Sequence, residues 1–251
     1  MSEKQTIAVV GLGTIGHSLA QLFATGGCEV RCYDPDDGAR ASLQSRVAFN
    51  FEQLERSGLA SSEQFRAARA RLTVCNTLRD ALGGDIFLVC EASVEDLAAK
   101  QRLFAEMESL VGDATLITSA SSSFEISAIG ARLDRPERAL VLHPFNPPHL
   151  IPVVEVVPGP RTTEAAVDAA VALLRQVGKR PIRLRKECPG FIVNRVQLAM
   201  LREVWALLDA GVASAEDIDE AVKGTLGLRL AAVGPLRVCG KRGPKHAHTH
   251  L

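Results

Sequence analysis

A histidine and a glutamate in the segment HPFNPPHLIPVVEVV, residues 143–157, could together perform acid–base chemistry. His143 ends one apolar run, and Glu155 sits at the centre of the valine run that follows a proline-rich loop. A buried carboxylate is costly unless it is paired, and an imidazole N–H is a suitable partner. Such a pair would fix the tautomer of His143 and let its ring remove a hydroxyl proton as a general base. A core histidine with a structural carboxylate fits the same spacing, so both interpretations stand at this point.

The elements around this pair predict where it lies. Short β-branched runs alternate with segments in which apolar residues recur every three or four positions. The runs predict strands at 6–10, 29–34, 72–75, 85–90, 114–119, 138–143, 153–157 and 180–185, with helices near 14–25, 96–111 and 163–176. This alternation predicts an α/β fold, a Rossmann-type, doubly wound and mostly parallel sheet with helices on both faces. His143 would then end a strand, at the sheet edge where ligands bind in such folds.

The segment GLGTIG, residues 11–16, directly follows the first predicted strand and opens a helix. Its glycines suit a tight turn, a close approach to a pyrophosphate and helix-on-strand packing. The predicted cofactor-binding positions are Gly11, Gly13, Thr14, Ile15 and Gly16. Asp34 ends the next strand, and its carboxylate can accept both ribose hydroxyls while it would repel a 2′-phosphate. The combination predicts NAD rather than NADP, against the alternative of a glycine-rich turn without a ligand.

The sequence pattern changes near residue 186. Residues 1–186 are the predicted NAD-binding domain, with a two-helix arm at 38–71 that breaks near RSGLASSE. Residues 187–236 predict a helical domain: a long helix between Pro189 and Gly211, then a second helix that Ser214 caps. Residues 237–251 are basic and rich in histidine and lack acids, which predicts a disordered tail.

Composition limits the partners. The formal net charge is zero, which gives no case for nucleic acid or an anionic membrane surface. No apolar run approaches the roughly 20 residues that span a bilayer. The six cysteines show no paired metal spacing, and no secretion signal precedes the first strand. We therefore expect a cytoplasmic protein with reduced thiols, no metal, no nucleic acid and no membrane partner.

Five motifs together resemble one known family: GLGTIG, CEASVEDLAAKQRLFAEME, ITSASSSFEIS, HPFNPPHLIPVVEVV and CPGFIVNR. They resemble the 3-hydroxyacyl-CoA dehydrogenase family, which includes the lambda-crystallin and L-gulonate 3-dehydrogenase branch, over residues 6–236. The resemblance implies an NAD-dependent enzyme that oxidises the 3-hydroxyl of a small-molecule substrate to a ketone. It also implies that His143 is the catalytic base and Glu155 its partner, so it favours the dyad.

The resemblance assigns roles to five further residues. Ser122 would help to hold the substrate hydroxyl, and Asn194 would contact the substrate carbonyl. Asn146 would bond near the nicotinamide or the histidine. Glu95 and Lys100 would contact the ribose or the amide of the cofactor. For each of them, the alternative is an ordinary loop hydrogen bond or a solvated face.

Two details bear on the substrate. Pro144, directly after the histidine, and the segment GLGLRLAAVGPL resemble the lambda-crystallin and gulonate branch and the carnitine dehydrogenases. They favour a small 3-hydroxy acid. A 3-hydroxyacyl-CoA of fatty-acid metabolism stays open, because the arginines of the arm could bind CoA phosphates, although they also fit a solvated face. Ala120 departs from the family, which has an asparagine there, and so lacks its amide contacts.

The end of the helical region also departs from the family, in which GPL at 234–236 leads into further helices that complete the substrate pocket and the dimer interface. Here it leads into RVCGKRGPKHAHTHL. We expect a homodimer only if the helical domain is completed, and otherwise exposed apolar side chains on the long helix, such as Leu198, Leu201, Trp205 and Leu208. The alternative function is an NAD(H)-binding protein with impaired turnover. A structural or storage role has no specific support in the sequence.

Overall fold

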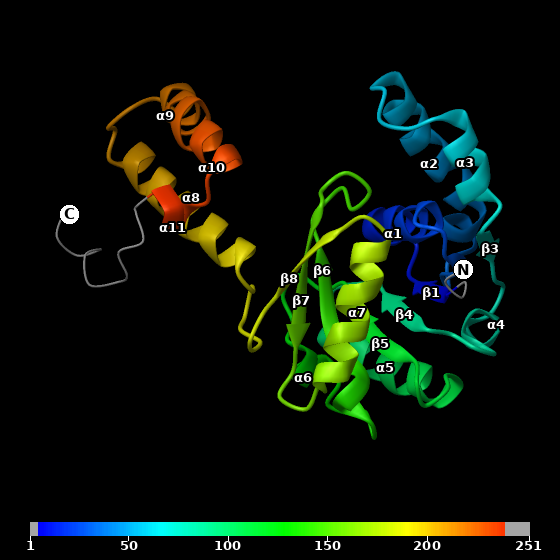
Figure 1. Cartoon of the computed structure of the whole chain (residues 1–251). Helices are drawn as coiled ribbons and strands as arrows, with labels where there is room; N and C mark the ends of the chain where they lie inside the picture. Colours follow the sequence, from blue (N-terminus) through cyan, green and yellow to red (C-terminus); the bar gives the residue numbers. More distant parts are fainter. Residues whose placement is uncertain (1–4, 239–251) are drawn as a thin grey trace. The chain divides into compact units, whose positions relative to one another are not determined.

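The computed structural model describes residues 5–238 of the chain (Figure 1). It divides into two compact units, Met1–Phe191 and Ile192–Leu251, each of which is considered by itself. The predicted tail at 237–251 lies outside the described residues, apart from its first two positions.

The first unit is built on one sheet of eight strands in the order β3-β2-β1-β4-β5-β6-β7-β8. The strands are β1 (Thr6–Val10), β2 (Glu29–Tyr33), β3 (Leu72–Val74), β4 (Leu88–Glu91), β5 (Leu116–Ser119), β6 (Ala139–Pro144), β7 (Val153–Pro158) and β8 (Arg180–Arg183). Every neighbouring pair is parallel except β6 and β7, which are antiparallel. The predicted doubly wound, mostly parallel fold is therefore confirmed. β4 and β5 begin later than predicted and β8 ends earlier, because strand ends depend on the neighbour with which they pair.

Helices cover both faces of this sheet (Figure 1). They are α1 (Thr14–Thr25), α2 (Asp37–Arg56), α3 (Ser62–Arg69), α4 (Leu78–Leu82), α5 (Leu97–Leu110), α6 (Ile126–Ile129) and α7 (Glu164–Gln176), with a 3₁₀ turn at Pro136–Arg138. Alternate residues of β1 serve the two faces: Ile7 and Val9 join the core beneath α1 and α7, whereas Ala8 and Val10 join the core beneath α5 and α6. This packing holds the carboxyl ends of the central strands in place.

Helices α2 and α3 occupy the segment that the sequence predicts as an arm. The chain breaks between them at 57–61, where Gly58 has a positive φ of 69° and Ser61 caps α3 through a capping box. The arm packs back on the sheet unit through apolar side chains of α2, and Phe51 lies against Phe65 of α3 with ring centroids 5.1 Å apart. It is thus a packed part of the first unit.

The second unit consists of α8 (Val193–Asp209), α9 (Ala215–Ala221), a π-helical segment (Val222–Gly227), α10 (Leu228–Ala232) and α11 (Pro235–Val238). The start of the long helix differs from the prediction. It begins at Val193, beyond Pro189, because Gly190 and Phe191 adopt positive φ angles of 72° and 51° that a right-handed helix cannot contain. Gly211 follows its end, and the hydroxyl of Ser214 accepts the Asp217 N–H to cap α9, as predicted.

The apolar side chains of α8 are largely exposed. Leu198, Trp205 and Leu208 are exposed as expected, whereas Leu201 is only partly exposed. Among residues 5–238, no helix combines the length and the apolar character that crossing a bilayer requires.

Candidate functional site

The antiparallel pairing of β6 with β7 brings His143 and Glu155 together. The two residues occupy directly facing positions of the ladder, so a loop of eight residues, 145–152, separates them along the chain but not in space. The Nδ1 atom of His143 lies 2.7 Å from Oε2 of Glu155, and both side chains are buried. The facing positions give the physical reason for a carboxylate in the middle of a valine-rich strand.

Aromatic rings hold the imidazole from two sides. The ring centroid of His143 lies 4.7 Å from that of Phe145 and 5.4 Å from that of Phe191. With Nδ1–H donated to Glu155, Nε2 is the nitrogen that remains to accept a proton. Asn146 lies in the following loop and is exposed, and its peptide bond to Pro147 is cis. The geometry suits a general base with a fixed ring orientation.

The glycine loop has the shape that a dinucleotide needs. A Cβ atom on Gly16 would lie 1.8 Å from the carbonyl oxygen of Gly11, so the helix can approach the turn this closely only without a side chain. A Cβ on Gly13 would meet no atom within 4 Å. The N-terminus of α1, with Thr14 and Ile15 in its first turn, therefore faces open space where a pyrophosphate fits.

Asp34 lies beside this loop, directly after β2. Its Oδ2 accepts the Leu12 N–H at 2.6 Å, and its Oδ1 accepts the Asp36 N–H at 2.9 Å. These bonds orient the carboxylate at the edge of the glycine loop, and each oxygen keeps a lone pair for a ribose hydroxyl. The residues present thus fit NAD.

The arginines of the arm are mostly engaged within the chain. Arg46 donates to the carbonyl oxygens of Leu12 at 2.6 Å and Ala39 at 2.9 Å. Arg40 donates to the Asp34 carbonyl, Arg71 to the Ala24 carbonyl, and Arg56 pairs with Glu52 one turn earlier. Arg66 and Arg69 are exposed. Most of these side chains therefore tie the arm to the cofactor loop and to its own helices.

Lys100 and Glu95, predicted as cofactor residues, lie next to each other at the carboxyl edge of the sheet. The Lys100 ammonium is 2.8 Å from Glu91 and 3.2 Å from Glu95, and the lysine side chain is only 1% exposed. Sequence reasoning missed Glu91, a buried carboxylate that ends β4. The sequence pattern around Glu91 resembles that around Asp34, since each is an acidic residue at the end of an apolar strand.

Ser122 and Asn194 lie in different units of the chain. Ser122 is exposed in the loop after β5, and its Oγ lies 3.4 Å from that of Ser123. Asn194 belongs to the second unit, in the first turn of α8. The predicted contacts of both residues with the substrate remain predictions.

Two further histidines, which sequence reasoning missed, link the glycine loop to the proline loop. His17 Nδ1 donates to the Gly13 carbonyl at 2.8 Å, its Nε2 lies 3.4 Å from Ser18 Oγ, and His149 Nδ1 lies 3.3 Å from the same hydroxyl. Burial is the largest cause that lowers the pKa of both histidines. For His17 the hydrogen bond to the Gly13 carbonyl opposes this shift and the Arg46 charge adds to it, and for His149 the charges of His17 and Lys179 lower the pKa further. The surroundings of both rings therefore favour neutral imidazoles.

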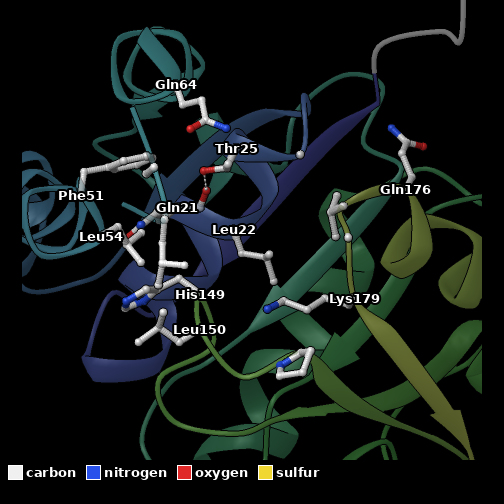
Figure 2. Close-up of a pocket in the computed structure, with 16 residues that line it drawn as sticks. Gln21, Leu22, Thr25, Phe51, Leu54, Gln64, His149, Leu150, Gln176 and Lys179 are labelled. Atoms are coloured by element: carbon white, nitrogen blue, oxygen red, sulfur yellow. Dashed lines mark hydrogen bonds between the residues drawn. The ribbon is translucent and has the colours of Figure 1, made fainter. Parts of the chain in front are cut away.

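His149 also borders a hollow of about 520 Å³ on the outer side of α1 (Figure 2). Its walls come from α1, the arm, the loop at 149–152 and the turn between α7 and β8. Figure 2 shows Lys179, whose Nζ donates to the Ile151 carbonyl at 2.9 Å, below Leu22. Neither His143 nor Glu155 lines this hollow, so it is separate from the candidate catalytic pair.

Known proteins are similar to this chain over nearly its whole length. The family description "3-hydroxyacyl-CoA dehydrogenase, NAD binding domain" matches residues 6–188, and "3-hydroxyacyl-CoA dehydrogenase, C-terminal domain" matches residues 190–251. Lambda-crystallin of Oryctolagus cuniculus is 36% identical over 92% of this chain and 72% of its own length. L-carnitine dehydrogenase of Pseudomonas aeruginosa is 38% identical over 93% of this chain and 71% of its own.

Solved structures are similar to this chain as well. The structure of (S)-3-hydroxybutyryl-CoA dehydrogenase from Ralstonia eutropha is 32% identical, with a TM-score of 0.83. The match covers 94% of this chain and 81% of that one.

Proposed function

This chain belongs to the 3-hydroxyacyl-CoA dehydrogenase family and is an NAD-dependent oxidoreductase, and from this premise we propose that it oxidises the 3-hydroxyl group of a small 3-hydroxy acid or its CoA ester to a ketone. The observation that carries the proposal is the buried His143–Glu155 pair at the carboxyl edge of the sheet. Nε2 of His143 takes the hydroxyl proton, and the Glu155 carboxylate stabilises the imidazolium that results. NAD, which the glycine loop and Asp34 would hold, would supply the acceptor for the hydride that leaves the same carbon.

The chain's other residues would orient the reactants. The glycine loop and Asp34 would hold the pyrophosphate and the adenosine ribose, with Glu95, Lys100 and Asn146 towards the nicotinamide end. Ser122 would hold the substrate hydroxyl, and Asn194 its carbonyl. Pro147 and Pro148 restrict the backbone of the loop after His143, which limits displacement of the base.

A small 3-hydroxy acid is the favoured substrate. Relatives that are 34–39% identical over most of this chain are lambda-crystallins and L-carnitine dehydrogenases. Arg40, Arg46 and Arg71 of the arm are bonded to backbone carbonyls, which leaves fewer cations for CoA phosphates. A CoA ester is the second candidate, because 3-hydroxybutyryl-CoA dehydrogenases of known structure are 32–34% identical to this chain.

An NAD(H)-binding role with impaired turnover is not favoured, since the family's C-terminal domain description matches the chain from residue 190 onward. We further propose that the chain forms a homodimer where the helical domain is completed, and that it acts in the cytoplasm. The thiols support a reducing compartment: among the described residues, Cys28, Cys32, Cys75, Cys90 and Cys188 are all free. Light scattering coupled to size-exclusion chromatography tests the dimer.

The test is NADH formation by the purified chain with NAD and three substrates in parallel: L-gulonate, L-carnitine and a short 3-hydroxyacyl-CoA. Absorbance at the NADH band measures turnover, and NADH fluorescence measures binding. We expect turnover with one of the two small acids. Turnover with the CoA ester alone would show that the substrate is a CoA ester and not a small 3-hydroxy acid. NADH binding without turnover of any of the three substrates would contradict the proposal.

A further inference from the structure

A closed ring of polar contacts joins the ends of β4 and β5 to the start of α5. The Lys100 ammonium lies 2.8 Å from Oε1 of Glu91 and 3.2 Å from Oε2 of Glu95. Oε2 of Glu91 accepts the Ser119 hydroxyl at 2.6 Å, and Ser119 Oγ accepts the Ser121 N–H at 3.1 Å. The Ser121 hydroxyl donates to Oε1 of Glu95 at 2.6 Å, which closes the ring.

Two ionisable side chains of this ring are almost completely buried. Glu91 is 0% exposed and Lys100 is 1% exposed. An ion pair of this kind costs about as much free energy in desolvation as it returns, so it is weak evidence for a stabilising role. Burial raises the pKa of Glu95, but the Ser121 hydrogen bond and the Lys100 charge lower it by more. These two interactions therefore favour the carboxylate form of Glu95.

Strand register places the ring between the cofactor loop and the catalytic base. Glu91 faces Val10 on β1 and Ser119 on β5, and Ser119 in turn faces Val141 on β6. Val10 directly precedes the glycine loop, and Val141 lies two residues before His143. The Ala92 N–H donates to the Val10 carbonyl at 2.7 Å, so the segment after Glu91 lies directly against the start of the glycine loop.

The ring also determines the shape of the serine loop. Oγ of Ser121 accepts the Ser123 N–H at 3.2 Å and the Phe124 N–H at 2.9 Å, and these bonds fix the backbone on both sides of Ser122. Glu95 is 39% exposed, more than the other charged members of the ring. The buried half of the ring thus supports Glu95 and Ser122, two residues that the family resemblance places in the site.

We propose that Glu91 is a positioning residue for the dehydrogenase reaction: without touching substrate or cofactor, it holds Glu95 in place through Lys100 and the loop around Ser122 in place through Ser119 and Ser121. The reaction itself rests on the proposed function above. In this assignment Lys100 keeps the cofactor contact that the family resemblance implies, and the two carboxylates beside it orient its ammonium.

The main test is Glu91→Gln, which removes the buried carboxylate and leaves the cofactor residues Glu95 and Lys100 in place. Glutamine keeps the size of the side chain, and the Lys100 ammonium keeps its 3.2 Å contact with Glu95, so a cooperative urea unfolding transition should show that the variant folds. We expect kcat to fall about 100-fold, since the serine loop loses its support. NADH should bind about tenfold more weakly, because a displaced Glu95 would lose one charged hydrogen bond to it.

Glu108→Gln is the matched control, because Glu108 lies on the same helix and accepts the Asp134 and Arg135 backbone N–H groups away from the ring. It should leave kcat and NADH affinity unchanged. Ser121→Ala is the milder ring variant and creates no buried charge. It should lower kcat and NADH affinity in the same direction as Glu91→Gln, whereas Ser109→Ala on α5 should not.

Unchanged kcat and NADH affinity in folded Glu91→Gln would overturn the proposal. If Glu91→Gln does not fold, Ser121→Ala decides in the same way. Should the wild type oxidise none of the three substrates, the proposed function fails, while the NADH affinities of the ring variants against Glu108→Gln still decide whether the ring positions the cofactor site.

Discussion

At the scale of single residues, the site is organised by carboxylates that have defined partners. Glu155 accepts from His143, and Asp34 accepts two backbone N–H groups beside the glycine loop. The first pair is enclosed by aromatic rings, whereas the second lies at the surface of the cofactor loop. The burial of the first suits proton transfer, and the partial exposure of the second suits ligand binding.

Replacement of His143 tests the base. His143→Ala should lower the rate of hydride transfer by about 10²–10⁴-fold, the range for loss of a general base. NADH affinity, measured by fluorescence, should stay nearly the same, because the glycine loop and Asp34 are untouched. A variant that lost NADH binding as well would show that His143 has another role.

Replacement of Asp34 tests the choice of cofactor. Asp34→Ala removes the predicted ribose contacts and should weaken NAD about 10–100-fold, as expected for lost charged hydrogen bonds. NADP should lose far less, because the carboxylate no longer repels its 2′-phosphate. Titration with both cofactors provides the comparison, and an equal loss for the two would refute the ribose assignment.

At the scale of elements, the turn from β1 into α1 depends on two glycines for different reasons. The missing side chain of Gly16 lets the helix pack against the carbonyl of Gly11, while that of Gly13 leaves open space at the helix N-terminus. The fold therefore requires Gly16, whereas we propose that the ligand requires Gly13.

Two alanine variants separate these requirements. Gly16→Ala places a methyl group against backbone and should lower the free energy of unfolding by about 1–3 kcal/mol or more. Gly13→Ala meets no atom of the chain and should leave that free energy nearly unchanged, yet weaken NADH, since its methyl group points into the space predicted for the pyrophosphate. Urea unfolding and NADH titration of both variants check this, and the reverse pattern would exclude it.

At the scale of the whole molecule, the first unit joins its loops through neutral histidines. His17 and His149 lie on elements far apart in sequence and both contact Ser18. Their pKa values are lowered in the folded chain, mainly by burial, from the ordinary value of 6.5. Protons therefore bind the unfolded chain more readily, and the stability that this linkage contributes is present above pH 6.5 and declines as the pH falls below it.

His149→Gln should reduce this acid sensitivity, because glutamine cannot take up a proton. We expect the urea midpoint of the wild type to fall more between pH 7.5 and pH 5.5 than that of the variant. The carboxylates contribute equally to both proteins over this range. Parallel declines in the two proteins would show that the His149 contact does not carry the linkage.

The alternation of strands and helices, the glycine loop, Asp34 and the His143–Glu155 candidates could all be derived from the sequence, because each depends on local periodicity or on residues close to one turn. The tertiary structure alone decided which groups meet. The antiparallel register of β6 and β7 sets the His143–Glu155 contact, and the order of β4 and β5 closes the ring around Lys100. Such contacts depend on strand order and register between segments distant in sequence, which no local pattern encodes.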